Sequence, residues 1–295
     1  MGTRVTITAV ARKRRQTNEA VQAAFTEIAR IDRLLSTYRE DSEISLLNRD
    51  KVLLNPSPEL TDNIRKSLSY SRLTGGAFDI TVGPMLELYN RTLVELQREP
   101  TEDERKQALS LIDYRLVNAG TDQITIGPNQ QITLGGIAKG YAVDRAGEIL
   151  RNRGVVDAIV EAGGDLLVMG KKSADRDWHI AIQNPRDPGD YIARVNAPDR
   201  AVVTSGDYER YYNSSKTYHH IINPLTGLSA TQLISVTLIA RSAFEGDVLS
   251  TSVFVLGKER GLELVESLDD VEALIITRSR EVIRSSGWDR FETEP

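Results

Sequence analysis

Residues 131–169 read QITLGGIAKGYAVDRAGEILRNRGVVDAIVEAGGDLLVM. A helix is predicted to start near Ile137 and to end at Gly154, because glycine is common just after the last turn of a helix. Short apolar runs on either side of this helix have the length and residue types of strands. They predict strands at 131–134, 156–161 and 165–169, and two shorter runs before them predict a small hairpin or meander at 115–118 and 123–126.

Before this stretch the chain is predicted to be mainly helical. A strand at Thr3–Val10 leads into a helix that ends at Leu35, whose apolar residues recur at helical spacing over four turns. Cap and stop residues predict further helices. The first ends near Asn48, the second runs from Pro58 to the glycines at 75–76, and the third runs from a capping box at 101–104 to about Leu111.

After this stretch strands are predicted to dominate. Apolar runs between turn residues predict strands at 178–183, 191–195, 200–204, 218–222 and 233–240. Two helices, beginning near Ser242 and after Lys258, and a hairpin within 271–284 complete the chain. Because no repeat or long linker interrupts residues 1–295, we expect one α+β domain of mixed or antiparallel sheets with packed helices, which could divide into two lobes.

The composition limits the classes of protein that the chain can be. Of 295 residues, 40% are hydrophobic and 27% are charged, which is enough for a large core. A formal net charge of -5, without a clustered basic arm, argues against nucleic acid as the main partner. The absence of cysteine excludes disulfides, thiolate metal sites and cysteine nucleophiles.

The segment 134–144, LGGIAKGYAVD, places three glycines and Lys139 where a predicted strand turns into a helix. Free amide groups at the positive end of a helix suit a phosphate. The segment lacks the G-x-x-x-x-G-K-[ST] spacing of a P-loop. The alternative interpretation is a tight turn with a surface lysine.

Asp247 and Thr251 lie four residues apart in a predicted helix, so their side chains share one face. A carboxylate and a hydroxyl, completed by phosphate and water oxygens, suit a hard cation such as Mg²⁺. The alternative is a structural role, because Asp is common in the first turn of a helix and Thr often bonds back to its own backbone.

His219 and His220 are two of the three histidines and lie in one predicted strand. Their side chains would then point to opposite faces, so at most one would reach a given cleft. A histidine there could take a proton from an attacking hydroxyl near neutral pH, or it could be a structural residue at the end of a strand. A Ser-His-Asp hydrolase is disfavoured, because the G-x-S-x-G elbow is missing.

Three further segments could contact a ligand. The glycine pairs in 74–81 and 161–165 would let the backbone approach a ligand closely, although most such pairs only make turns. Tyr38 lies in a polar stretch and could stack on an aromatic ligand or simply be exposed.

Together these segments resemble the ApbE family, the FAD:protein FMN transferases or flavin transferases. Each matching block is short, but the blocks follow the family order from residue 1 to about 257. They are 1–3, 36–48, 74–84, 135–144, 163–165, 205–210, 220–227, and Asp247 with Thr251. The resemblance implies an ApbE-like, T-fold-related α+β architecture.

The resemblance also implies a reaction. Enzymes of this family use Mg²⁺ to cleave the pyrophosphate of their substrate FAD. They attach FMN through a phosphoester to a threonine or serine of an acceptor flavoprotein, such as a subunit of a redox complex, and release AMP. Two other functions stay open, an FAD pyrophosphatase that gives FMN and AMP, and an FAD-binding protein without turnover.

Carried over to this sequence, the family pattern assigns a role to individual residues. His220 would be the base that activates the acceptor hydroxyl. Mg²⁺ would bind the backbone carbonyl of Gly136 and the side chains of Asp247 and Thr251. The residues expected to bind FAD are Met1 and Tyr38, on either side of the isoalloxazine, with Ala77, Phe78, Asp79, Thr133 and Lys139.

Thr133 is a departure from the family pattern, which usually has an acidic residue at this position. An FAD contact or a carboxylate near the metal would then be lost or replaced, and Glu161 and Asp165 are the candidate replacements. Family members commonly reach the cell envelope. The resemblance therefore implies a periplasmic or outward-facing, membrane-associated location, with a leader or lipid anchor outside this sequence, while a cytoplasmic location stays open.

Overall fold

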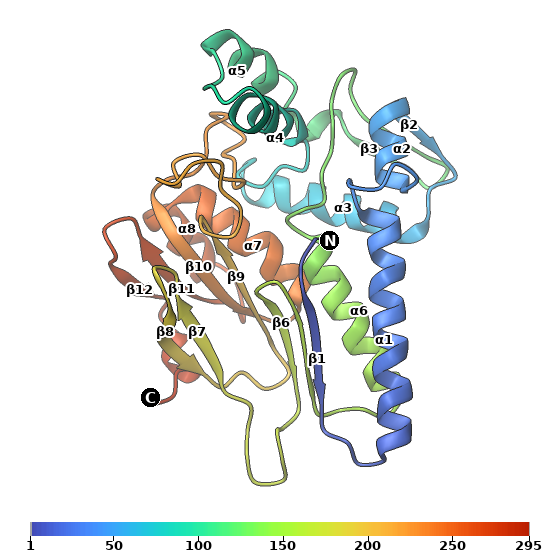
Figure 1. Ribbon diagram of the computed structural model, residues 1–295, viewed down its shortest axis with the longest axis vertical. Coiled ribbons are helices and arrows are strands. Elements are labelled where there is room, and N and C mark those ends of the chain that lie inside the picture. Colours follow the sequence, from blue (N-terminus) through green and yellow to red (C-terminus); the bar gives the residue numbers. More distant parts are fainter. Residues whose placement is uncertain (1, 295) are drawn as a thin grey trace.

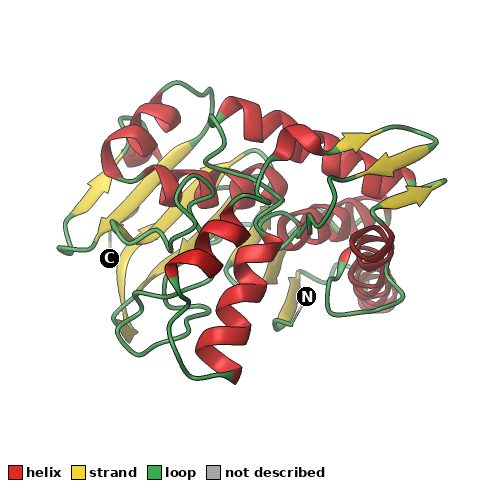
Figure 2. Cartoon of the chain, turned by 90° about the horizontal axis from the view of Figure 1, so that it is seen from above, coloured by secondary structure: helices red, strands yellow, loops and turns green. Residues whose placement is uncertain are grey.

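The computed structural model describes residues 2–294. In this part of the chain the largest sheet has seven strands in the order β1-β5-β6-β9-β10-β11-β12, and every neighbouring pair is antiparallel (Figure 1). β1 and β12 are the two edges of this sheet, so the first and the last strand of the chain lie at its opposite edges (Figure 2). The strands are β1 (Val5–Ala9), β5 (Ala158–Ala162), β6 (Asp165–Met169), β9 (Ala201–Gly206), β10 (Leu233–Ala240), β11 (Glu272–Thr277) and β12 (Val282–Arg284).

The long helices are stacked on one face of this sheet. α6 (Ala138–Asn152) and α7 (Ala243–Leu256) pack on the sheet and on each other, and α1 (Arg14–Leu35) packs on α6 (Figure 1). Ala24 and Ile31, on the predicted apolar face of the first helix, are buried in this core. The predicted α+β architecture of antiparallel sheets and packed helices is confirmed. Within residues 2–294 no helix is both long enough and apolar enough to cross a membrane.

The opposite face of the large sheet is covered by the hairpin of β7 (Ile180–Asn184) and β8 (Asp187–Val195). Alternation along β9 separates the two cores, because Val203 packs with the helices and Val202 with the hairpin. The fully buried Trp288 belongs to the second core. The large sheet is therefore buried on both faces, and packing fixes the strands that carry the site.

The remaining elements lie within residues 43–126 or follow α7. Of these, α4 was not predicted, because its short Gly-Pro start is typical of a turn. The predicted capping box of Thr101 and Glu104 is present. The elements are α2 (Glu43–Asp50), β2 (Val52–Leu54), α3 (Pro58–Leu73), α4 (Gly83–Tyr89), a π-helical turn (Asn90–Glu95), α5 (Glu102–Leu109), a 3₁₀ turn (Tyr114–Leu116), β3 (Asn118–Ala119), β4 (Gln123–Thr125), α8 (Lys258–Glu266) and a 3₁₀ turn (Trp288–Arg290).

The strand predicted at 131–134 is wrong, because side chains satisfy its backbone instead of a ladder. The Asn48 side chain donates to the carbonyl of Ile132 (2.8 Å) and accepts from the amide of Ile132 (2.7 Å). The amide of Thr133 donates to the carbonyl of Ile80 (2.8 Å). This segment is therefore held extended between α2 and the turn that precedes α4, and it leads directly into the glycines at 135–136.

The strand predicted at 218–222 is also wrong. β9 pairs directly with β10, so residues 207–232 leave the sheet as one long loop between these strands. The backbone of the predicted segment bonds within the loop: the amide of His220 donates to Arg210 (3.1 Å) and the amide of Ala230 donates to Ile221 (3.0 Å). Only isolated bridges form in this loop, within the residues that the structure describes.

α6 and α7 approach each other unusually closely at Gly140. A Cβ atom on Gly140 would lie 2.2 Å from the carbonyl oxygen of Ala243, so a larger residue does not fit here. The carboxylate of Asp144 accepts hydrogen bonds from the amides of Ala243 (2.8 Å) and Phe244 (2.9 Å) and so fixes the first turn of α7 onto α6. Glycine and the aspartate cap together set the distance between the two helices.

This packing predicts the effect of Gly140→Ala. The added methyl group meets backbone, so α6 and α7 must separate, and we expect the free energy of unfolding to fall by about 1–3 kcal/mol. Urea unfolding followed by circular dichroism measures it. The control is Gly189→Ala, whose Cβ would have ordinary contact with Asp187 at 3.5 Å and should change stability by less than about 0.5 kcal/mol. Equal unfolding midpoints for the two variants would contradict the packing argument.

Candidate active site

An ammonium group between two buried carboxylates is the centre of the candidate site. The Lys139 Nζ atom lies 2.6 Å from Asp165 Oδ2 and 3.5 Å from Asp247 Oδ1. Asp165 and Asp247 are buried, while a quarter of the Lys139 side chain is exposed. Burial opposes the charged form of Lys139, but the two carboxylates outweigh it and raise its pKa. Burial and the charge of Asp247 raise the pKa of Asp165, although Lys139 acts in the opposite direction.

Three different elements bring these groups together. Lys139 lies in the first turn of α6, as the glycine-rich motif predicted. Asp165 opens β6 directly after Gly163 and Gly164, both of which have the positive φ that glycine allows. Asp247 lies on α7, and its Oδ2 atom accepts a hydrogen bond from the amide of Gly140 (3.2 Å). The close approach of α6 and α7 is what makes this last bond possible.

The residues expected to bind the metal lie next to this cluster. Thr251 follows Asp247 by one turn of α7, and its Oγ1 atom lies 3.4 Å from Ser205 Oγ on β9. A methyl group on Gly136 would lie 3.5 Å from Thr251 Oγ1 and 3.2 Å from the ring of Phe78. The structure thus brings Gly136, Asp247 and Thr251 together from two distant segments.

The chemistry of these donors fits Mg²⁺. Within residues 2–294, no group of three or more His, Asp or Glu side chains could hold a metal ion. An ion here would need hydroxyl, backbone, phosphate and water oxygens beside one carboxylate, which is how proteins commonly hold Mg²⁺. Asp165 Oδ1 is buried and has no hydrogen-bond partner among the described residues. A buried carboxyl oxygen without a partner is costly, and an additional cation beside the site would compensate it.

The two adjacent histidines have different roles. His219 is buried, and both its ring nitrogens contact backbone: Nε2 lies 2.8 Å from the carbonyl oxygen of Ala230, and Nδ1 accepts from the amide of Ile221 (3.3 Å). His220 is half-buried, and its Nδ1 lies 3.0 Å from the carbonyl oxygen of Arg210. Because a carbonyl can only accept, Nδ1 carries the proton and Nε2 has a free lone pair. His219 is therefore structural, and His220 can act as a base.

His220 is uncharged at neutral pH. Burial lowers its pKa to about 4, with further lowering from His219 and from the positive charges of Arg210 and Lys139, although the bond to the Arg210 carbonyl acts in the opposite direction. The influence of Lys139 links His220 to the carboxylate cluster. A neutral imidazole with a free Nε2 can accept a proton throughout the physiological pH range.

Tyr38 provides an exposed aromatic surface near His220. It lies in the loop between α1 and α2, which Ser42 closes by donating to the carbonyl of Ser36 (2.7 Å) and by capping α2. Its ring is 66% exposed. The guanidinium carbon of Arg210 lies 5.7 Å from the ring centroid, so the loops that carry Tyr38 and His220 are in contact.

The other residues expected to bind FAD are mostly buried around Gly136. Ala77 and Phe78 are buried, and the Phe78 ring faces Gly136. Asp79 is buried, which raises its pKa, and its oxygens accept hydrogen bonds from Thr81 and from the amide of Tyr114 (3.0 Å). Asp79 therefore fixes the turn that carries Phe78.

The outcomes for Thr133 and Met1 differ. Thr133 Oγ1 accepts from the amide of Gly135 (3.2 Å) and so shapes the glycine turn. Of the two carboxylates considered as replacements for an acid at this position, Asp165 lies beside Lys139, whereas Glu161 pairs with Thr6 in the register of β1 and β5. Met1 lies outside the described residues.

Sequence reasoning assigned no role to two residues of this site. Asp144 holds the start of α7. Its place in the middle of a predicted helix was a sequence signal for such a contact, because Asp is unfavourable inside a helix unless it has a partner. Arg210 contacts both Tyr38 and His220, and nothing in its local sequence points to these contacts.

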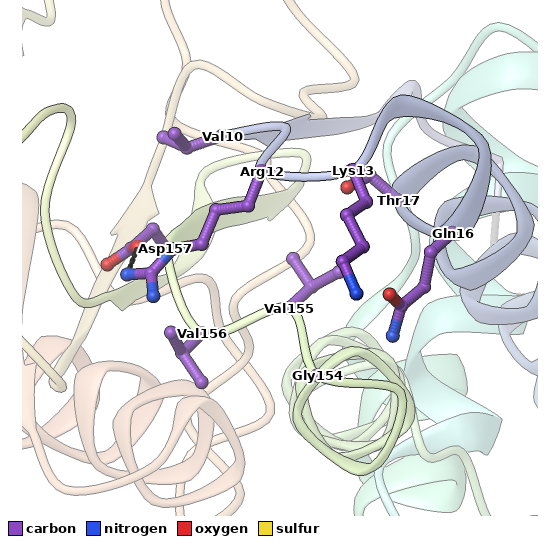
Figure 3. Close-up of a pocket in the computed structure, with 9 residues that line it drawn as sticks. All are labelled: Val10, Arg12, Lys13, Gln16, Thr17, Gly154, Val155, Val156 and Asp157. Carbon is purple, nitrogen blue, oxygen red and sulfur yellow. Dashed lines mark hydrogen bonds and ion pairs between the residues drawn. The ribbon is translucent and has the colours of Figure 1, made fainter.

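Two hollows do not contain the lysine, the candidate metal ligands or the histidine of this site. One of about 180 Å³ lies beside Gly154, at the opposite end of α6 from Lys139, and contains the ion pair of Arg12 and Asp157 at 2.8 Å (Figure 3). A larger one of about 790 Å³ lies between α3, α6 and α7 and is lined in part by Tyr70 and Asp144. Lys139, Asp247 and His220 line neither hollow.

Comparisons with known proteins show the family of this chain. The family model of the ApbE family matches residues 1–275. A relative from Treponema pallidum named FAD:protein FMN transferase is 30% identical over 296 residues, covering 92% of this chain and 81% of the relative. One of the same name from Escherichia coli K12 is 32% identical over 252 residues, covering 81% and 72%.

Solved structures give the same result. The crystal structure of an ApbE protein from Thermotoga maritima has a TM-score of 0.87 and 33% identity, covering 99% of this chain and 96% of the other. The flavin transferase ApbE from Vibrio cholerae has a TM-score of 0.82 and 27% identity, with the same coverage.

The low pKa of His220 gives a direct test of the site. Because the folded protein favours neutral His220, its ring should become half-protonated at about pH 4, well below the ordinary value of about 6.5. Titration of the ring resonances by NMR measures this, and His220→Gln assigns the signal among the three histidines. A midpoint of 6.5 or higher would contradict the described environment.

Proposed function

The chain belongs to the ApbE family, and from this premise we propose that it is an enzyme that transfers FMN from FAD to an acceptor flavoprotein. The observation that carries the proposal is the position of Lys139 between two buried carboxylates, together with a neutral His220 whose pKa the charge of Lys139 helps to lower. Phosphoryl transfer needs charge neutralisation and a positioned, deprotonated hydroxyl more than it needs a covalent enzyme intermediate. These residues offer both.

The proposed chemistry is one displacement at phosphorus. The hydroxyl of an acceptor threonine or serine attacks the phosphorus of the FMN half of FAD, a phosphoester forms, and the bond to the second phosphate breaks. AMP leaves with that phosphate. His220 Nε2 takes the proton of the attacking hydroxyl, which is supported by the Nδ1 contact with Arg210 that leaves Nε2 free.

Mg²⁺ would be held by the carboxylate of Asp247, the hydroxyl of Thr251 and the carbonyl of Gly136, and when bound it would neutralise the pyrophosphate. Lys139 would contribute its positive charge at the same place, held there by Asp165. The family pattern usually has an acidic residue where this chain has Thr133. Asp165 would take over the role of that residue. Its burial and its contact with Lys139 support this assignment.

The flavin would lie against Tyr38, and Phe78 and Ala77 would form the wall behind Gly136. The exposed ring of Tyr38 and the contact between Phe78 and Gly136 support this placement. The expected periplasmic or outward-facing location stays a prediction, as does the redox-complex subunit as acceptor.

The direct test of the function is incubation of the protein with FAD, MgCl₂ and an acceptor flavoprotein domain that contains a candidate target threonine. We expect a mass spectrum with the acceptor heavier by one FMN. Asp247→Ala should lower this rate at least about 100-fold, because the cation that would neutralise the reacting phosphates loses its carboxylate ligand, and FAD binding should largely survive. Asp62→Ala, on the exposed face of α3, is the matched control.

Two outcomes of this experiment would overturn the proposal. Intact FAD without an adduct would indicate a binding protein without turnover. Free FMN and AMP, formed at a rate that the acceptor does not change, would indicate an FAD pyrophosphatase.

His220→Ala should lower kcat for transfer by about 100-fold or more, because a positioned general base typically contributes this much. The dissociation constant for FAD, measured by quenching of flavin fluorescence, should change by less than about threefold, since this role needs the base only for the acceptor proton. His179→Ala, at an exposed position, is the control. A change in FAD affinity with unchanged kcat would make His220 a binding residue instead.

A further inference from the structure

Arg210 contacts two parts of the site with two different groups. Its backbone carbonyl accepts hydrogen bonds from His220 Nδ1 (3.0 Å) and from the His220 amide (3.1 Å). Its guanidinium lies over the ring of Tyr38, with the central carbon 5.7 Å from the ring centroid. Tyr38 comes from the loop after α1, and His220 comes from the loop between β9 and β10. Arg210 therefore joins the aromatic surface to the base.

The contact with Tyr38 constrains the carbonyl that His220 uses. Arg210 lies in a long loop outside the sheet, where few ladder bonds fix the backbone. A cation over an aromatic ring is attracted by the negative face of the ring. Anchoring the side chain on Tyr38 restricts the freedom of the main chain at Arg210, and the direction of its carbonyl decides which nitrogen of His220 carries the proton.

We propose that Arg210 is a positioning residue for proton transfer, whose side chain, held on Tyr38, fixes the backbone carbonyl that orients His220. This inference rests on the proposed transfer of FMN to an acceptor. Without the anchor, the His220 ring can rotate or change tautomer, so that Nε2 is presented to the acceptor hydroxyl for a smaller fraction of the time. The chemical step then slows, while the flavin site keeps its remaining contacts.

The charge of Arg210 has a second, separable effect. The groups that act on His220 are its neighbour His219, the guanidinium of Arg210 and the ammonium of Lys139, and all three disfavour the imidazolium form. Removing the charge of Arg210 should therefore raise the pKa of His220. Because the base must be neutral to act, the acid limb of the rate profile should move to higher pH. A purely structural role would not move this limb.

The matched control lies in the same loop. Lys216 also places a cation over a tyrosine, with Nζ 5.3 Å from the ring centroid of Tyr211. Its ring partner is Tyr211, not Tyr38, and its carbonyl is not the one that His220 uses. Lys216→Met thus removes one positive charge and one cation–aromatic pair from this loop without touching the proposed link.

The experiment compares Arg210→Met, Arg210→Lys and Lys216→Met over a range of FAD concentrations up to saturation, with wild-type transfer to the acceptor domain as the reference. We expect Arg210→Met to lower kcat about 10-fold, to change KM for FAD by less than about threefold and to move the acid limb to higher pH. Arg210→Lys, which keeps a cation over Tyr38, should restore most of kcat and the original limb. Lys216→Met should behave as the wild type.

A double-mutant cycle distinguishes the proposed link between Arg210 and Tyr38 from a general loss of stability. If Arg210 acts through Tyr38, Arg210→Met should lower kcat much less in the Tyr38→Leu background than in the wild type. The inference is overturned if Arg210→Met matches Lys216→Met, if only KM changes, or if the effects of the two substitutions multiply independently. Absence of transfer by the wild type would instead overturn the proposed function.

Discussion

The structure of the site depends on the ammonium of Lys139, which lies between the buried carboxylates of Asp165 and Asp247. Burying charges is costly unless each has a partner, and one lysine only partly compensates two carboxylates. Asp165 Oδ1 has no partner in the described part of the chain. With both carboxylates ionised, the cluster would have one negative charge in excess in a poorly solvated place. The raised pKa of Asp165 reflects this cost, and an additional cation would offset it. A metal-bound pyrophosphate would supply that cation and bring its own negative charge toward Lys139.

The helix packing explains why these charges meet at all. Gly140 removes the side chain that would separate α6 from α7, and the backbone amide of Gly140 can then donate to Asp247. Asp144 fixes the start of α7 from the same helix. The glycine-rich motif thus does more than leave room for a phosphate, because it also sets the distance at which the second helix delivers its carboxylate and hydroxyl.

Much of the fold could be predicted from local sequence, because the elements obey local rules. The glycine after α6, the capping box of α5 and the apolar face of α1 all have signals within a few residues. The failures at 131–134 and 218–222 have a different cause. The first segment bonds to Asn48, which is 84 residues away. The second lies in a loop that is outside the sheet, because β9 pairs directly with β10. The local motifs pointed to Lys139, Asp247 and Thr251. They could not predict that Asp165 holds Lys139 or that the Arg210 carbonyl selects the tautomer of His220, because these contacts join separate segments of the chain.

We propose that Asp247 and Thr251 face a divalent ion beside the pyrophosphate of bound FAD. Crystals grown with FAD and MnCl₂, where manganese is an anomalous scatterer in place of magnesium, test it most directly. The account predicts an anomalous peak within coordination distance of the Asp247 carboxylate, the Thr251 hydroxyl and the Gly136 carbonyl, next to the phosphates. A peak elsewhere, or bound FAD with its phosphates away from α7, would contradict it.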